Sequence, residues 1–144
     1  MAIKFRCSCA ITSALDVVGD KWILVIIKQM LIEGVETFKG FLERDEAIAT
    51  NILSVKLKLL EKLGLITKSK RLTNKKTNYY HLTDKGLTLT PIVIELAVWS
   101  HLNLRELNES IGDYEELEAI KNDKEAYCKR LIEEYKQKIS THAS

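Results

Sequence analysis

The chain has 144 residues, 46% of them apolar and 29% charged, which suits one globular domain with a real core. No segment reaches the roughly 20 consecutive apolar residues that span a bilayer, and no apolar signal segment is found, so we expect a cytoplasmic protein without a membrane partner. Three cysteines, an odd number, argue against a disulfide scaffold.

The formal net charge of +2 is unevenly distributed. Residues 50–86 carry nine Lys or Arg and two acids, a local charge of +7, whereas residues 106–139 carry ten acids and six bases. A basic block of this kind is typical of a phosphate-contacting surface, although a solvated lysine-rich face has the same composition.

Four helices are predicted in the first half of the chain, over residues 11–18, 21–32, 38–44 and 49–64. Glycines end the first, second and fourth helices, and Asp20 and Thr37 are the expected N-cap residues of the second and third. The third and fourth helices, with the turn at 45–48, form a predicted helix-turn-helix.

The fourth helix is amphipathic. At 100° per residue its apolar face gathers Leu53, Leu57 and Leu60. The opposite face presents small polar side chains and a cation, namely Thr50, Asn51, Ser54 and Lys58. Such a face can enter a major groove and reach base edges.

Two strands, 65–71 and 78–82, are predicted to form a hairpin around the polar, cationic loop 72–77. Helix, glycine, strand, basic turn and strand follow one another in the order of a winged helix. We therefore predict a mainly α fold with a small β-hairpin (α+β), a winged helix-turn-helix with additional N- and C-terminal dimerisation helices.

A fifth helix is predicted from Thr83–Gly86 to about Asn103, and Pro91 either kinks it or marks a later start. Its apolar stripe, Ile92, Leu96 and Trp99, exceeds what the preceding core can cover, so we expect a partner surface there. A sixth helix over 114–139, with a candidate break at residues 122–123, is a candidate to wrap the partner. We divide the chain into a domain over 1–104 and a helical extension over 105–144.

The ordered motifs resemble the HxlR family of winged-helix transcriptional regulators of bacteria and archaea. The matching segments are Cys9, Ala14–Trp22, Thr37–Phe38, Ile48–Leu65, Tyr80–Gly86, Leu89-x-Pro91 and Trp99. The resemblance covers residues 7–103 and implies a regulator that binds a double-stranded DNA operator. Two departures are Val55, where such proteins usually place Asp, Glu or Gln, and a wing without proline.

A homodimer is expected, because one recognition helix reads too few base pairs for useful specificity. The predicted DNA contacts on the helix are Thr50, Asn51, Ser54, Lys56 and Lys58, although Lys56 lies nearer the apolar face and either reaches phosphate or pairs internally. The predicted wing contacts are Lys68, Lys70, Arg71, Lys75 and Lys76. The alternative is a winged-helix protein–protein interaction module that does not bind DNA.

Cys7 and Cys9 are candidate redox-sensor residues. Cys9 matches the position where some members of the resembled family carry a redox- or electrophile-reactive thiol, and nearby cations such as Arg6 would lower its pKa. The alternative is a pair of ordinary small residues at the dimer seam, the apolar interface that we expect the first and fifth helices to form. Cys-x-Cys alone is a weak zinc motif, so we predict no metal and no cofactor. No catalytic constellation is found, so we expect no enzyme, but a small-molecule or electrophile effector is a candidate partner.

Overall fold

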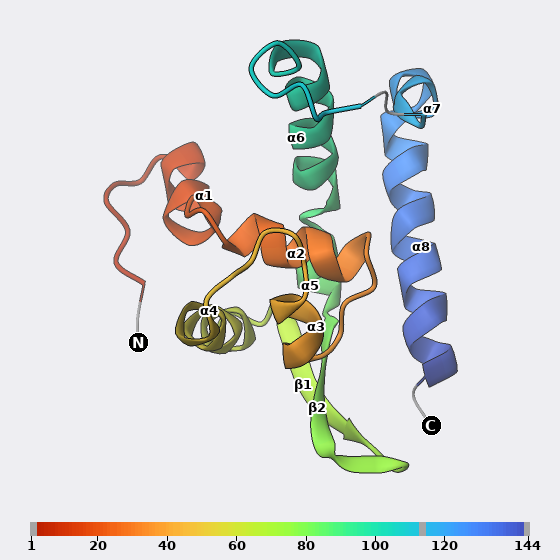
Figure 1. The fold of residues 1–144 in the computed structure, drawn as a ribbon. Coiled ribbons are helices and arrows are strands. Elements are labelled where there is room, and N and C mark those ends of the chain that lie inside the picture. Colours follow the sequence, from red (N-terminus) through yellow and green to blue (C-terminus); the bar gives the residue numbers. More distant parts are fainter. Residues whose placement is uncertain (1–2, 113–114, 143–144) are drawn as a thin grey trace.

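The computed structural model describes residues 3–112 and 115–142. Along the chain its elements are α1 (Ala10–Val18), α2 (Ile23–Leu31), α3 (Phe38–Leu42), α4 (Thr50–Lys62), β1 (Ile66–Arg71), β2 (Asn74–Leu82), α5 (Asp84–Leu87), α6 (Thr90–Asn103), α7 (Leu117–Asn122) and α8 (Lys124–His142). The fold is mainly helical with one two-stranded antiparallel hairpin, which confirms the predicted class (Figure 1).

The core is built around α2, whose Ile23, Ile26, Ile27 and Met30 have no exposed surface. A helix that is apolar on most sides must be covered on most sides. The hairpin, α6 and α8 all pack against α2. The predicted apolar face of α4, Leu53, Leu57 and Leu60, is buried in the same core.

Two glycines fix how the hairpin leaves α4. Gly64 follows α4 with a φ of +75°, a left-handed conformation that costs other residues about 1–2 kcal/mol. At Gly86 a Cβ atom would lie 2.2 Å from the Leu65 carbonyl oxygen, so only glycine lets α5 approach the start of the hairpin this closely. The base of the hairpin is therefore held tightly against α4 and α5.

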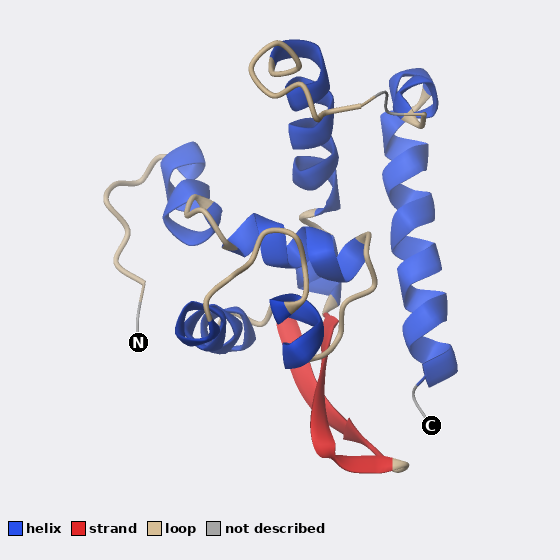
Figure 2. Cartoon of the chain, in the orientation of Figure 1, coloured by secondary structure: helices blue, strands red, loops and turns tan. Residues whose placement is uncertain are grey.

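The hairpin is longer than predicted. Arg71 pairs with Asn74, which leaves only Leu72 and Thr73 as the turn, so the predicted loop over 72–77 is wrong. The Asn74 side chain accepts hydrogen bonds from the amides of Lys76 and Thr77. Figure 2 shows the outer part of the hairpin projecting beyond the helices. Because no core lies beside it, its sequence lacks the alternation of apolar and polar residues that reveals a strand.

In the second half of the chain, the helices are interrupted where the sequence predicts. Pro91 lies in the first turn of α6 and marks its late start, and Thr83 caps the separate short helix α5. The sixth predicted helix is divided at Asp123 into α7 and α8, while its expected first residue, Tyr114, lies outside the described residues.

The C-terminal helix α8 does not extend freely toward a partner. It packs along α6 and α2 of its own chain (Figure 1). Ile94 of α6 is buried against Tyr127 and Cys128 of α8. Part of the apolar face of α8 is thus covered within its own chain, and the expectation that the last helix wraps another subunit stays a prediction. The division at residue 104/105 stays a prediction.

Candidate nucleic-acid interface

The polar face of α4 is open to solvent as predicted. Thr50, Asn51 and Lys58 are exposed and Ser54 is half-buried, and none of the four has a side-chain partner among the described residues. Val55 lies on the same helix and is 55% exposed. The sequence marks Val55 only as a departure from the resembled family, and an exposed valine beside polar groups has the chemistry to contact a thymine methyl group.

Lys56 follows the second of its two predicted alternatives. Its Nζ lies 2.7 Å from Oδ2 of Asp20, whose other oxygen accepts from the Trp22 and Ile23 amides. Burial raises the pKa of Asp20, but the hydrogen bonds from Lys56 and the two amides outweigh it and lower the pKa overall. Lys56 therefore ties α4 to the start of α2 and has less charge to offer a phosphate.

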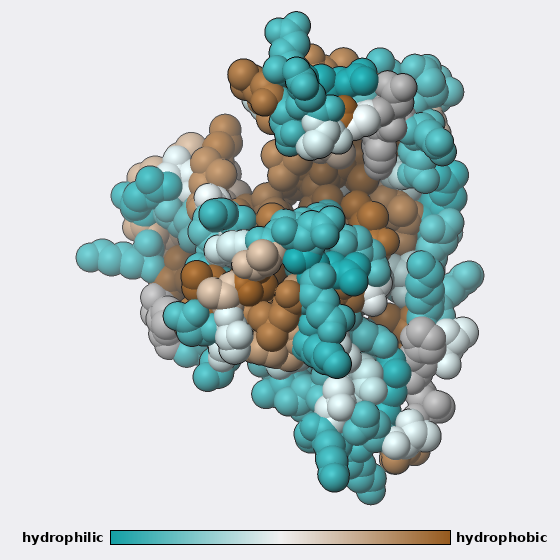
Figure 3. Space-filling model, viewed as in Figure 1, coloured by the Kyte–Doolittle hydropathy of each residue, from teal (hydrophilic) through white to brown (hydrophobic). Residues whose placement is uncertain are grey.

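Four predicted wing lysines are available to a partner. Lys68, Lys70, Lys75 and Lys76 are exposed, and within the described ranges none is paired with an acid. In Figure 3 the hairpin surface is mostly hydrophilic, with the exposed Leu72 at its tip. In Figure 1, α4 and the hairpin lie on the side of α2 opposite α6, so one extended ligand can contact both.

Arg71 is different, because its side chain reaches back from the turn end of β1 to Glu36 and Tyr79. Its Nη2 lies 2.7 Å from Oε1 of Glu36, and its guanidinium stacks 3.8 Å from the centre of the Tyr79 ring. The Nε2 atom of His81 lies 3.0 Å from the other Glu36 oxygen. Burial raises the pKa of Glu36, but the hydrogen bonds from His81 and Arg71 outweigh it and the pKa falls below its ordinary value. Arg71 thus positions the hairpin, and its charge is already balanced.

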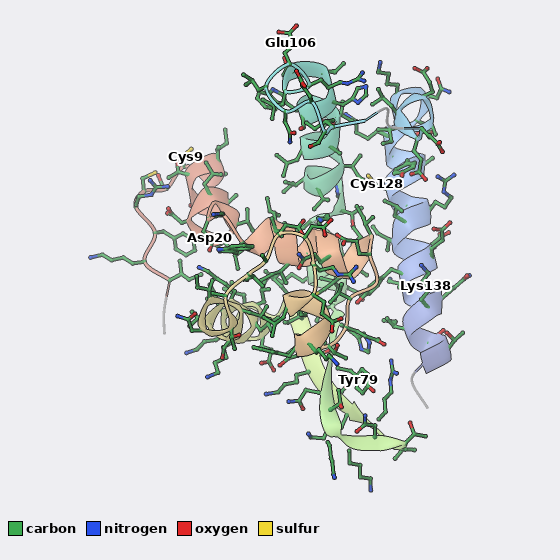
Figure 4. All side chains as sticks on the ribbon, viewed as in Figure 1. Cys9, Asp20, Tyr79, Glu106, Cys128 and Lys138 are labelled. Carbon is green, nitrogen blue, oxygen red and sulfur yellow. The ribbon has the colours of Figure 1, made fainter. Side chains whose placement is uncertain are left out.

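Cys9 is exposed at the N-cap of α1, on a different helix from the buried Cys128 of α8 (Figure 4). The Thr12 amide, the Thr12 hydroxyl and the Ile11 amide, all in the first turn of α1, lower the pKa of the neighbouring Cys9 thiol. The helix N-terminus, and not the predicted cations, is therefore the cause, and Arg6 is paired with Asp16 at 2.6 Å. Cys7 is also exposed.

Residues 3–112 and 115–142 contain no cluster of three or more His, Cys, Asp or Glu placed to hold a metal ion. In the same ranges no helix is long and apolar enough to cross a membrane.

The model of the HxlR-like helix-turn-helix family matches residues 17–108. The chain belongs to this family. It is 31% identical over 102 residues to the HTH-type transcriptional regulator YybR of Bacillus subtilis, an alignment that covers 71% of this chain and 80% of YybR. The HxlR-like proteins it matches are transcriptional regulators, and this chain is therefore a regulator of the helix-turn-helix type.

Two solved structures of regulators share the fold. The redox regulator HypR in its reduced form is 29% identical, with a TM-score of 0.61 over 70% of this chain and 99% of HypR. The reduced transcriptional regulator YodB of B. subtilis is 26% identical, with a TM-score of 0.54 over 74% of this chain and 100% of YodB. HypR has also been solved oxidized, and YodB after diamide treatment.

Proposed function

We propose that this HxlR-like protein is a sequence-specific DNA-binding regulator that acts as a homodimer. The observation that carries the proposal is the pairing of an unpartnered polar face on α4 with four unpartnered lysines on the adjoining hairpin. A recognition helix in the major groove and a cationic wing on the neighbouring backbone use these two surfaces together.

Each residue has a separate role in the proposal. Asn51 presents an amide that can form two hydrogen bonds with an adenine, and Val55 contacts a thymine methyl group beside it. Thr50, Ser54 and Lys58 contact bases or phosphates next to them. Lys68, Lys70, Lys75 and Lys76 supply sequence-independent phosphate contacts. Lys56 and Arg71 orient these groups through their acidic partners.

The homodimer is supported by an unusual helix. α6 carries apolar residues on several sides beside its exposed Glu95: Ile94 and Val98 pack on α8, Val93 packs on the main core, and Leu96 and Trp99 are 50% and 56% exposed. On α1, Ile11 and Leu15 are exposed as well. Figure 3 shows apolar surface gathered between these two helices. A second copy of the chain would cover this surface and place two recognition helices on one DNA site.

The experiment that tests this function is to sequence the DNA fragments that the protein retains from its own genome. We expect a short set of enriched fragments that share a two-fold motif. The alternative, a protein–protein interaction module, gives no enrichment over random fragments, and its interactions depend little on salt or on the hairpin lysines.

We further propose that oxidation at Cys9 modulates DNA binding. Support comes from its exposure, its lowered pKa and its place at the start of α1 beside the proposed dimer seam, together with the likeness to the redox regulator HypR. Diamide takes two electrons and two protons from a pair of thiols and leaves a disulfide. The second thiol is either Cys7, two residues away across a bend at residues 6–8, or a thiol of the partner subunit.

Operator binding is therefore measured with and without diamide for the native protein, Cys9→Ser and Cys128→Ser. We expect a response in the native protein and in Cys128→Ser, whose thiol is buried, and none in Cys9→Ser. If diamide leaves operator binding of the native protein unchanged, or still changes that of Cys9→Ser, Cys9 is only a packing residue.

A further inference from the structure

The outer edge of the hairpin is closed by two segments from elsewhere in the chain. β2 pairs with β1 on one side only, so amides on its other side need partners. The Tyr80 amide donates to the Glu36 carbonyl oxygen at 2.8 Å, and the Leu82 amide donates to the hydroxyl oxygen of Tyr135 at 2.9 Å. The first partner lies between α2 and α3, and the second lies on α8.

The Tyr135 contact is buried and held in place. Tyr135 is 6% exposed, and burial raises the pKa of its hydroxyl to about 12 although the Leu82 amide opposes that rise. α8 is held by the packing of Tyr127 and Cys128 on α6 and of Tyr135 in the main core. Exposed ion pairs also join Lys136 to Asp84 of α5 and Lys124 to Glu95 of α6. The hydroxyl therefore stays at the base of the hairpin.

This contact comes from a part of the chain that the family model does not match. The match ends at residue 108, and α7 and α8 lie beyond it. Because α8 packs on α6 and also bonds the hairpin, it connects the exposed apolar seam of α6 with the proposed wing.

We propose that Tyr135 is a positioning residue for DNA binding. Its hydroxyl holds the base of the hairpin at a fixed angle to α4, so that Lys75 and Lys76 meet the phosphates beside the groove that α4 enters. Tyr135 itself does not touch DNA. The inference rests on the proposed DNA-binding function, and it adds a determinant in the C-terminal extension.

The test is Tyr135→Phe, which removes one oxygen and keeps the ring. Tyr127→Phe is the matched control, since Tyr127 is 4% exposed on the same helix and its hydroxyl has no hydrogen-bond partner among the described residues. Operator affinity is measured for both variants in the native background and in Lys75→Ala with Lys76→Ala. Amide hydrogen exchange is followed in free protein across residues 66–82 and α4.

We expect Tyr135→Phe to weaken operator binding about 3- to 10-fold, the equivalent of one hydrogen bond, and Tyr127→Phe to change it less than about 2-fold. Without the two lysines, Tyr135→Phe should have no further effect, because the wing it positions no longer contributes. Exchange at Leu82 and along the hairpin should accelerate while α4 stays protected.

A loss of affinity that persists without the lysines would overturn the proposal, since Tyr135 would then act through general stability. Unchanged exchange of the hairpin would overturn it whatever the DNA result. Failure of the native protein to bind DNA would instead contradict the proposed function, and the exchange measurement still tests the role of the hydroxyl in that case.

Discussion

At the residue scale, α4 carries two kinds of polar side chain. Some can specify a DNA sequence, and others fix the helix in place. Asn51 is exposed and unpartnered, whereas Lys56, on the same helix, is paired with Asp20. The sequence predicts the polar face because helical periodicity separates it from Leu53, Leu57 and Leu60. It does not predict the Lys56–Asp20 pair, because those residues are 36 positions apart and meet only in the folded chain.

Replacing Asn51 by Ala should cost about 1–3 kcal/mol of binding free energy on the operator and almost nothing on random DNA. The physical reason is that a bidentate amide–adenine contact exists only at the correct base pair. Titrations on both DNAs measure the difference, with the exposed Asn122→Ala as control. Equal losses of binding free energy on operator and random DNA would show that Asn51 contacts only the DNA backbone.

The Glu36 network makes stability depend on pH. Because its folded pKa lies below the ordinary value of 4.5, ionised Glu36 stabilises the protein fully above that value, and the contribution disappears as pH falls through the folded pKa. Glu36→Gln should therefore cost about 1–2 kcal/mol at pH 7 and less at pH 3.5. Urea unfolding at both pH values measures this, with the exposed Glu43→Gln as control. A destabilisation of the same size at both values would contradict the role of the charge.

At the element scale, the hairpin is the part that the sequence describes least well. Its existence follows from the glycine after α4 and from the basic segment, but its length does not, because the distal strands contact no core. Arg71 appears in the sequence as one of several wing cations, and only the fold brings it to Glu36 and Tyr79. The contact between Tyr135 and Leu82 likewise cannot be predicted from the sequence, since the two residues are 53 positions apart.

The hairpin lysines should set the salt dependence of binding. Removing one phosphate-binding lysine flattens the slope of log affinity against log salt by about 0.9, so Lys75→Ala with Lys76→Ala should flatten it by about 1.8. Binding isotherms at four salt concentrations give the slope, with Lys121→Ala and Lys129→Ala on the distant helices α7 and α8 as control. A slope that matches the native value would remove the hairpin from the interface.

At the scale of the whole molecule, the proposed DNA-facing surface and the apolar seam lie on opposite sides of α2. α4 and the hairpin face one way, while α6 carries its exposed apolar residues on the other side (Figure 1). A dimer through α1 and α6 thus leaves both recognition helices free. The sequence predicts this seam because the apolar stripe of α6 is too wide for one core, but it does not show that α8 covers a second side of the same helix.

Leu96→Glu should convert the proposed dimer into a folded monomer, because it places a charge in the proposed seam at a position that is half exposed in the single chain. Sedimentation should give twice the chain mass for the native protein and the single chain mass for the variant. Leu72→Glu, on an exposed leucine at the tip of the hairpin, is the control and should stay dimeric. A native protein that sediments as a monomer at micromolar concentration would exclude the seam.

The most direct test of symmetric DNA recognition is a hydroxyl-radical footprint on a DNA fragment selected from the genome. Two recognition helices related by a two-fold axis predict two equivalent protected regions, centred about 34 Å apart or a multiple of that distance. Wing contacts predict additional protection of the backbone beside each region, which should disappear in Lys75→Ala with Lys76→Ala. A single asymmetric protected region, or no protection at concentrations that saturate retention, would contradict the proposal that this HxlR-like regulator reads DNA as a symmetric dimer.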